Sequence, residues 1–411
     1  MQKKQKVIKS KKILQRNKTM NILFYRYGSI CEPAIINTFR SMNINVIEET
    51  SEITNKSLTP SECVDLVNKY IQKHHPVFVF SINFFPAIAE ICHLLQTLYV
   101  CWTVDSPVLE LFSKSIEYKT NRIFLFDRAQ YDYFSPFNPD CIFHLPLASD
   151  INHFDKIIQT IDNNDVNKYS SDISFIGSLY SEKNPMNDIN LPEYESGYVN
   201  GIVEAALQVY GYNLIPDSIP QNIVHCFHSA NANLSPIVNT VADPSSYIVA
   251  HSYIGMQVAK TERIRTINQL AKHFSVDLYT RSDTTPLKNV HINNGIKTLT
   301  EMPKAFHLSK INLNMTIKPI QTGLPLRIFD IMGCGGFLMT NYQLEIPELF
   351  ELGVDLETYS SAEELIDKCE YYLSHDEERK KIAQNGYLKV KKQHSYQHRI
   401  MEMFKIITKD S

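Results

Sequence analysis

The chain has 411 residues, 44% of them hydrophobic, and a formal net charge of −3. This length suggests about two to three domains, and the nearly balanced charge gives no overall sign of nucleic-acid binding. No stretch approaches the roughly 20 apolar residues of a membrane span. The eight cysteines are scattered without a CxxC pair, which favours a reducing, cytoplasmic compartment over a disulfide-stabilised secreted protein.

Residues 1–19 form the one basic block of the sequence. They carry lysine or arginine at positions 3, 4, 6, 9, 11, 12, 16 and 18, and they lack the apolar core that a secretory signal needs. We expect a disordered tail, or an upstream extension of a shorter product that starts at Met20, because runs of like charge are usually solvated. Peripheral contact with an anionic membrane surface is the functional alternative.

The first domain is predicted from strands that alternate with helices. The predicted strands are 21–27, one starting at Val46, 77–81, 98–102, 122–126 and 141–145, and the predicted helices are 32–42, 61–73 and 87–95. This alternation is typical of right-handed βαβ units in one parallel sheet. We therefore predict a Rossmann-like domain over residues 20–150.

The alternation resumes after residues 151–171, a segment rich in Asn and Asp that is predicted to be a linker. Further strands are predicted at 172–178, 276–280, 290–292 and 311–316, and further helices at 258–273, 302–309, 362–373 and 377–390. They predict a second Rossmann-like domain over 172–393, with an irregular or helical insertion at 181–257 and a final helix within 394–411. The chain is thus predicted to be an α/β protein whose two domains face each other across a cleft.

The segment from Gly323 to Thr340 has the order that a diphosphate site needs. Gly323 lets the backbone approach a phosphate without a Cβ in the way, and Arg327 can bind phosphate oxygens through its planar guanidinium group. Asp330 shares a helix face with Arg327, and a carboxylate there can accept hydrogen bonds from a ribose diol. The simpler alternative is that Arg327 and Asp330 are only a salt-bridged pair.

Motif segments spread over most of the chain carry a resemblance to a known family. In the second half they are Ile311–Asn314, Gly323–Asp330, Gly333–Phe337, Glu348–Phe350, Tyr359–Leu365, Tyr372–His375 and His394–Arg399. Nearer the amino terminus they are Tyr25–Pro33, Trp102–Pro107, Phe126–Arg128, His144–Pro146 and Asp172–Ser178. Together these segments resemble GT-B glycosyltransferases of the spore-maturation CgeB type and the domain often fused to them. Residues 181–260 match least.

This resemblance implies a GT-B fold and transfer of a sugar from a nucleotide-diphosphate donor to a protein, glycan or lipid-linked acceptor. It associates Arg327 with the diphosphate and Asp330 with the ribose. Related retaining enzymes carry a second acidic residue seven positions upstream, where this chain has Gly323, so inverting transfer is expected. The rivals are a GT-B sugar-nucleotide epimerase or hydrolase, and a non-catalytic protein that binds nucleotide sugars or glycans.

Further donor contacts are expected from the loops of the second domain. Gly177 and Ser178 follow its first strand, where a glycine turn meets a helix. Thr322 can offer hydroxyl or backbone contacts. Tyr359 can flank the nucleotide, although ordinary packing explains it equally well.

The acceptor side is expected in the first domain, where Glu32 and Asp105 are candidate catalytic bases. Glu32 follows the loop at Gly28 and is expected at the edge of the cleft, although acidic residues also stabilise helix amino termini. Asp105 ends a strand region before Ser-Pro, where a turn or helix cap is the alternative. Gly28 and His144 are assigned to the acceptor side, with structural packing as the alternative for His144.

No cofactor is expected, because the nucleotide sugar serves as co-substrate. No metal is expected either. His225-Cys226-x-His228 contains potential ligands but has no matching second cluster. GT-B enzymes generally stabilise the leaving diphosphate with backbone amides and cationic side chains, so the resemblance implies metal-independent transfer.

Overall fold

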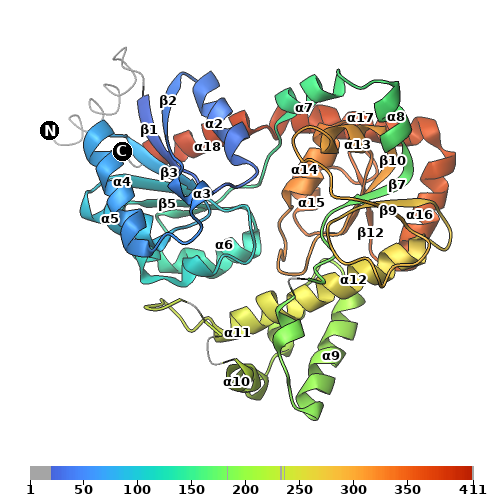
Figure 1. The fold of residues 1–411 in the computed structure, drawn as a ribbon, viewed down its shortest axis with the longest axis horizontal. Coiled ribbons are helices and arrows are strands. Elements are labelled where there is room, and N and C mark those ends of the chain that lie inside the picture. The colour runs from blue at the N-terminus through green and yellow to red at the C-terminus, as the bar shows by residue number, and fades with distance from the viewer. Residues whose placement is uncertain (1–19, 183, 232–233, 236, 410–411) are drawn as a thin grey trace.

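The computed structural model describes residues 20–182, 184–231, 234–235 and 237–409, so the predicted basic tail at 1–19 lies outside it. The described residues contain two six-stranded sheets whose strand pairs are all parallel. Figure 1 shows them side by side, each with helices packed around it. The predicted α/β class with two Rossmann-like domains is confirmed.

The first sheet has the strand order β2-β1-β3-β4-β5-β6. Its strands are β1 (Met20–Tyr25), β2 (Ile44–Glu49), β3 (Phe78–Ile82), β4 (Leu98–Trp102), β5 (Asn121–Leu125) and β6 (Ile142–His144), and the accompanying helices are α2 (Glu32–Ser41), α3 (Ser51–Thr54), α4 (Pro60–His74), α5 (Pro86–Leu94) and α6 (Arg128–Phe134). Short 3-10 turns lie at Leu109–Phe112, Lys114–Glu117 and Ser135–Phe137. Alternate residues of β3 enter two different hydrophobic clusters, as expected for a parallel strand covered on both faces.

The second sheet has the order β12-β11-β10-β7-β8-β9. Its strands are β7 (Ser171–Ile176), β8 (Val276–Tyr279), β9 (His291–Asn293), β10 (Ser309–Asn314), β11 (Leu338–Asn341) and β12 (Glu357–Tyr359), and the helices of this domain are α12 (Gly255–Leu270), α13 (Met302–Leu308), α14 (Leu326–Gly333), α15 (Ile346–Leu349), α16 (Ala362–Ser374) and α17 (Asp376–Gln393). Strand β12 was not predicted. It has only three residues, too few to show a sequence period.

Two segments expected to be less regular are largely helical. The predicted linker contains α7 (Ile151–Ile158) and α8 (Asn163–Tyr169). Both helices begin with an aspartate cap, Asp150 and Asp162, so the polar residues that suggested a linker are partly helix-capping residues. The insertion contains η4 (Pro185–Asp188), α9 (Glu193–Leu207), η5 (Pro216–Ser218), α10 (Gln221–Ala230), α11 (Ser245–Ile248) and the π-helix η6 (Val249–Ile254), which continues into α12. Figure 1 shows α9 and α10 projecting below the two domains.

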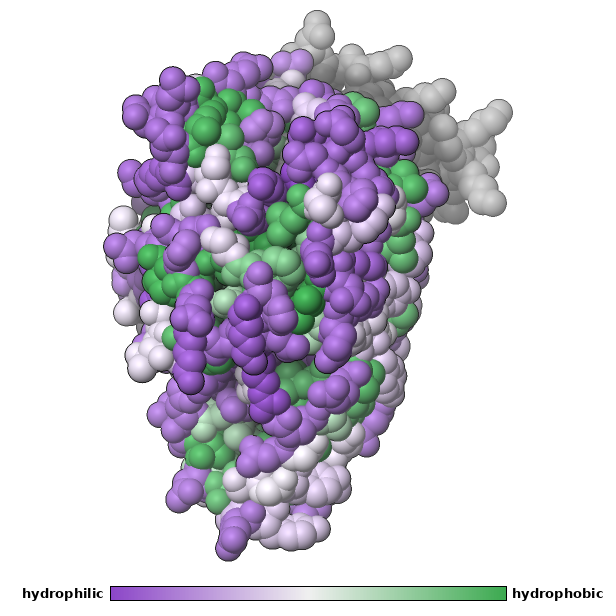
Figure 2. Space-filling model, turned by 90° about the vertical axis from the view of Figure 1, so that its right-hand side faces the viewer, coloured by the Kyte–Doolittle hydropathy of each residue, from purple (hydrophilic) through white to green (hydrophobic). Residues whose placement is uncertain are grey.

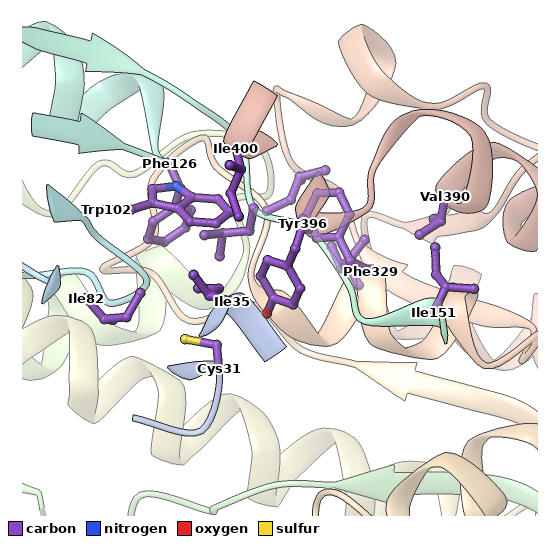
Figure 3. Packing of buried hydrophobic residues seen from close by; sticks show 14 of the residues in the cluster. Cys31, Ile35, Ile82, Trp102, Phe126, Ile151, Phe329, Val390, Tyr396 and Ile400 are labelled. Atoms are coloured by element: carbon purple, nitrogen blue, oxygen red, sulfur yellow. The ribbon is translucent and has the colours of Figure 1, made fainter. Parts of the chain in front are cut away.

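The final helix, α18 (Tyr396–Lys409), returns to the first domain. Phe404 packs on Phe39 and Phe78, with ring centroids 6.3 and 6.1 Å apart, and Tyr396 meets Trp102 at 6.0 Å. Figure 3 shows Tyr396 within a cluster that contains residues of both domains. The two domains therefore share one hydrophobic cluster at their junction.

The outer face of the second domain is mostly hydrophilic, with small separate groups of hydrophobic residues (Figure 2). Among the described residues, no helix is both long and apolar enough to cross a membrane.

Each sheet has a topological switch point, where successive connections leave in opposite directions along the sheet. In the first sheet it lies between β1 and β3, and in the second between β7 and β10. Ligands of open α/β sheets bind at the carboxyl ends of the strands at such points. The fold therefore directs attention to the loops that follow these four strands.

Candidate active site

The switch point of the second sheet, which we call the carboxyl-terminal switch point, opens into two adjoining cavities of about 580 and 680 Å³. Both cavities are lined by Ile176, Gly177, Ser178 and Arg327. We call them together the switch-point cavity. One part is lined by residues after β7 and β10, including Tyr180 and Thr316, and the other by residues after β8 and β9, including Ser282 and Gly295. The cavity thus lies at the carboxyl ends of the strands, as the topology requires for a ligand site.

Arg327 lies in the first turn of α14, after Pro325, and borders both parts of this cavity. Its Nη1 lies 2.6 Å from the sulfur of Met302, and its guanidinium group lies 5.2 Å from the ring centre of Phe306. Burial lowers the pKa of Arg327, and the negative charge of Asp330 opposes this shift. A cation held in such an apolar, desolvated place interacts strongly with an entering anion.

Gly177 and Ser178 border the same cavity as Arg327, so the structure brings these three predicted residues together. Ser178 Oγ accepts a hydrogen bond from the amide of Tyr180 at 2.8 Å and lies 3.2 Å from Ser282 Oγ. These bonds link the loop after β7 to the loop after β8.

Arg263 and Arg281 also line this cavity, and no local sequence pattern singles out Arg263. Arg263 donates from Nη1 to Ser178 O at 2.6 Å and from Nη2 to Met315 O at 2.7 Å, so it links the loops that follow β7 and β10. Its guanidinium group lies 4.6 Å from the ring centre of Tyr180, and its Nε has no hydrogen-bond partner. It comes from α12, directly after the insertion, and only the tertiary fold brings this helix to the strand ends.

Asp330 opens into a different space from Arg327. It lines an interdomain cavity of about 630 Å³ with Cys31, Asp150, His153 and Tyr396. Burial raises the pKa of Asp330 to about 7, although Arg327 acts in the opposite direction. Thr298 and Met302 border both this cavity and the switch-point cavity, so the two spaces adjoin. A simple salt-bridged pair is not observed, because no direct Arg327–Asp330 contact is present among the described residues.

Thr322 and Gly323 do not face the switch-point cavity, contrary to their expected role at the donor. Thr322 Oγ1 lies 2.8 Å from a carboxylate oxygen of Asp127 and 2.8 Å from one of Glu345. A Cβ built on Gly323 would lie 2.7 Å from the Cα of Asp127. Glycine is therefore needed here for the close approach of the two domains, because any side chain would push them apart.

Tyr359 is buried in the core, so its expected place beside the nucleotide is wrong. It is 1% exposed, belongs to the hydrophobic cluster under the second sheet and packs edge-on against Tyr210 with ring centroids 5.9 Å apart. The packing alternative explains this residue, because strand β12 carries its side chain inward.

Glu32 is fully buried, so its expected position at the open edge of the cleft is also wrong. Its Oε1 accepts hydrogen bonds from the amides of Tyr27 and Gly28 at 2.9 and 3.0 Å, and its Oε2 pairs with Arg26 Nε at 3.1 Å. The side chain has no exposed surface. Glu32 therefore holds the turn after β1, the structural role that was its alternative. Gly28 has a φ of +95°, a left-handed conformation that favours glycine in this turn.

Asp105, by contrast, is exposed in the loop after β4, next to the switch point between β1 and β3. Its Oδ2 accepts a hydrogen bond from Asn83 Nδ2 at 2.7 Å. Asn83 Nδ2 also donates to the hydroxyl of Tyr27 at 3.0 Å, and Asn83 Oδ1 accepts from the amide of Val104. The next residue, Ser106, donates to Pro319 O at 2.8 Å, in the loop whose Thr316 and Ile320 line the switch-point cavity. Asp105 thus has a solvent-exposed carboxylate close to the interface between the two domains.

His144 bridges the domains instead of facing a cleft. Its Nε2 lies 2.9 Å from a carboxylate oxygen of Glu345, and its ring packs near Tyr131. The structural alternative accounts for His144, because its polar atom is used by a partner from the other domain.

The possible metal ligands around His225 do not assemble into a cluster. His228 Nε2 lies 2.8 Å from the hydroxyl of Ser245. In the part of the chain that the structure describes, no group of three His, Cys, Asp or Glu side chains is arranged to hold a metal ion.

Residues 262–405 match the family model described as "Glycosyl transferase-like". This segment, which includes Arg263, Arg327 and Asp330, is therefore similar to glycosyl transferase-like domains. No curated protein sequence matches the chain.

Solved structures share the fold over nearly the whole chain. A glycosyltransferase from Rickettsia africae is 11% identical with a TM-score of 0.51, and the match covers 96% of this chain and 100% of that one. HepE from Anabaena, solved in complex with UDP and glucose, is 11% identical with a TM-score of 0.50, covering 95% and 100%. Sucrose-phosphate synthase from Thermosynechococcus elongatus is 8% identical with a TM-score of 0.55, covering 95% and 100%. The fold is GT-B, and together with the family match it supports glycosyltransferase activity.

Proposed function

We propose that this protein transfers a sugar from a nucleotide-diphosphate donor to an acceptor hydroxyl or amide. The observation that carries the proposal is the switch-point cavity, where two arginines lie beside the glycine turn after β7. An anionic diphosphate is the ligand that these guanidinium groups favour. The sequence suggests that the turn after β7 leads into a helix, but the described residues that follow this turn do not begin an α-helix directly.

Arg327 supplies the main stabilisation of the leaving diphosphate in this proposal. Its planar guanidinium group can hold two phosphate oxygens at once, and its partial burial strengthens the attraction as negative charge develops. Arg263 adds a second positive charge under the same cavity and keeps the loops after β7 and β10 together. The proposed mechanism is metal-independent and rests on these two side chains.

The nucleoside is proposed to extend from the switch-point cavity towards Asp330. Thr298 and Met302 mark the place where the two cavities adjoin, and a carboxyl group there can bind a ribose diol whether it donates or accepts the hydrogen bonds. The UDP bound by HepE makes UDP-sugars the first donors to test.

Asp105 is the proposed catalytic base. Its carboxylate removes the proton from the acceptor group while the acceptor atom bonds to the anomeric carbon and the diphosphate leaves from the opposite side. This sequence inverts the anomeric configuration. The bond from Asn83 Nδ2 fixes the carboxylate, so that its second oxygen is free for the acceptor.

Finer assignments rest on the sequence motifs alone. They are membership of the CgeB type, a protein, glycan or lipid-linked acceptor, and a cytoplasmic location, the last in line with eight cysteines that are all free. Peripheral membrane contact through residues 1–19 belongs with these proposals.

The decisive experiment combines binding with turnover. Wild-type protein is screened by thermal shift against UDP, GDP, ADP and CDP, because a ligand of the folded state alone raises the melting temperature. The matching nucleotide sugars are then incubated with the protein, and release of the nucleoside diphosphate is measured with and without candidate acceptors.

We expect one nucleoside diphosphate to stabilise the protein and its sugar donor to be turned over faster with an acceptor. Epimerisation of the donor without any acceptor would favour the epimerase alternative. Binding without any turnover would favour the non-catalytic binding protein.

A further inference from the structure

Asp127 of the first domain binds a loop of the second domain. It follows β5 and caps α6, where its Oδ1 accepts a hydrogen bond from the amide of Ala129 at 3.1 Å. The residue has no exposed surface. A fully buried carboxylate needs several donors to offset its lost hydration, and most of the donors to Asp127 come from the other domain.

The donors belong to residues 316–325, which connect β10 to α14 and which we call the β10–α14 loop. The amide of Gln321 lies 2.7 Å from Asp127 Oδ2, and the amides of Thr322 and Gly323 lie 3.1 and 3.2 Å from Oδ1. The hydroxyl of Thr322 lies 2.8 Å from the same Oδ1. Three successive amides of one domain thus point at a single carboxylate of the other.

A second carboxylate holds the same loop from its own domain. Glu345 accepts from the amide of Arg128 at 2.8 Å, lies 2.8 Å from Thr322 Oγ1 and contacts His144 at 2.9 Å. Glu345 is 2% exposed. The interdomain contact therefore uses buried, charge-assisted hydrogen bonds, which are stronger than neutral ones.

The two ends of the β10–α14 loop reach the switch-point cavity. Thr316, Ile317, Ile320 and Pro325 line it, and Arg327 follows within two residues. Movement of Gln321–Gly323 would therefore move the lining of the cavity and the start of α14. Precise placement of groups around a reacting centre matters, because small displacements cost large factors in rate.

We propose that Asp127 is a positioning residue that orders the β10–α14 loop, so that the proposed diphosphate site is complete only when the first domain is docked. This inference rests on the proposed function for its consequence, but the ordering of the loop can be measured without any ligand. Asp127 acts through Gln321, Thr322 and Gly323 and does not touch the substrate.

The ligand-free experiment measures amide hydrogen exchange in the full chain. In Asp127→Asn we expect the amides of Gln321–Gly323 to exchange about 10- to 100-fold faster than in wild type, because they lose a charged acceptor. The control is Glu348→Gln. It removes an exposed ion pair with Arg128 at the same junction, with side chains 41% and 51% exposed, and should leave these amides unchanged. Unchanged exchange in Asp127→Asn overturns the proposal.

A second pair of variants covers the case in which Asp127→Asn does not fold. Thr322→Val removes the hydroxyl that both carboxylates contact, and we expect it to accelerate exchange in the same loop. Thr322→Ser keeps the hydroxyl and should match wild type. Equal exchange in the two variants contradicts the proposed role of this hydrogen-bond network.

The ligand arm uses isothermal titration with UDP. If wild type binds UDP, Asp127→Asn should raise the dissociation constant by about 10-fold or more, while Glu348→Gln should not. Normal UDP affinity in an Asp127→Asn protein whose loop exchanges quickly would overturn the link to the diphosphate site. If wild-type protein binds none of the nucleoside diphosphates of the screen, the proposed function fails, and the exchange result still decides whether Asp127 orders the loop.

Discussion

The two switch points of this molecule have the same topology and opposite contents. At the amino-terminal one, the amides of Tyr27 and Gly28 bind the carboxylate of Glu32, which also pairs with Arg26. At the carboxyl-terminal one, the turn at Gly177 borders an open cavity with Arg263 and Arg327. The first site is occupied by a buried carboxylate of the protein itself, whereas the second presents three arginines and one carboxylate, Glu182, to a space that a ligand can enter.

This difference gives the two domains their roles. A phosphate near Glu32 would lie beside a buried negative charge. Repulsion between the phosphate and this carboxylate would be strong, because the local dielectric constant is low. The same phosphate in the switch-point cavity would meet the guanidinium groups of Arg263, Arg281 and Arg327, with one carboxylate, Glu182, in the lining. This contrast supports the proposal that the donor binds to the second domain and that Asp105, in the loop after β4, acts on the acceptor.

The largest expected effect comes from Asp105→Asn. Loss of a general base lowers the turnover number by about 10²- to 10⁴-fold, while the affinity for the nucleoside diphosphate should stay unchanged. Steady-state kinetics with the donor found in the screen, together with titration of the nucleoside diphosphate, measures both quantities. Full activity in Asp105→Asn would show that Asp105 is not the catalytic base. It would also contradict the proposal that the first domain acts on the acceptor.

Arg327→Ala tests the other switch point. We expect turnover to fall by about 10²- to 10³-fold, as for the loss of a group that stabilises developing negative charge, and binding of the nucleoside diphosphate to weaken. Arg265→Ala is the matched control, because Arg265 is exposed on α12 and pairs with Glu204 at 2.7 Å. Wild-type affinity in Arg327→Ala would mean that the diphosphate lies elsewhere.

Glu32→Gln should affect stability instead of chemistry. It removes a buried charge that two amides and Arg26 contact, so we expect the free energy of unfolding to fall by about 1.5–3 kcal/mol. Denaturant titration measures this loss, and Glu48→Gln, which alters a partly exposed partner of Arg26, should lose less. If Glu32→Gln keeps its stability and loses turnover, the catalytic role first considered for Glu32 is restored.

A pH-dependent effect is expected for Asp330, whose pKa burial raises to about 7. The folded protein then holds a proton that the unfolded chain, with a carboxyl pKa of about 4, has already released. The contribution of Asp330 to stability should therefore be fully present below about pH 4 and be lost as the pH rises towards 7. In Asp330→Asn this loss disappears, so the variant should gain on wild type by at most about 1.4 kcal/mol per pH unit in this window. A pH-independent difference in unfolding free energy would contradict the raised pKa.

The sequence was sufficient for features that depend on local patterns. Strand and helix alternation predicted both Rossmann-like sheets, and a glycine turn directly after a strand predicted the position of Gly177. Arg327 was singled out because it stands between Gly323 and Asp330 in the order that a diphosphate site needs. Each of these inferences uses residues that are close together in the chain.

The tertiary structure alone decided which side chains meet. Arg263 reaches the cavity from α12 and lies 85 residues after Ser178, to whose carbonyl it donates, and no local pattern distinguishes it from other helical arginines. Thr322 and Gly323 had the composition of a phosphate loop, but their amides are used by Asp127 across the domain junction. Glu32 and Tyr359 were predicted to face the cleft from their positions next to a loop or a helix. In the structure both side chains are buried, so neither faces the cleft. The physical reason is the same in each case. The residue type determines which donors and acceptors a side chain has, but the packing of elements distant in the sequence determines which partners they meet.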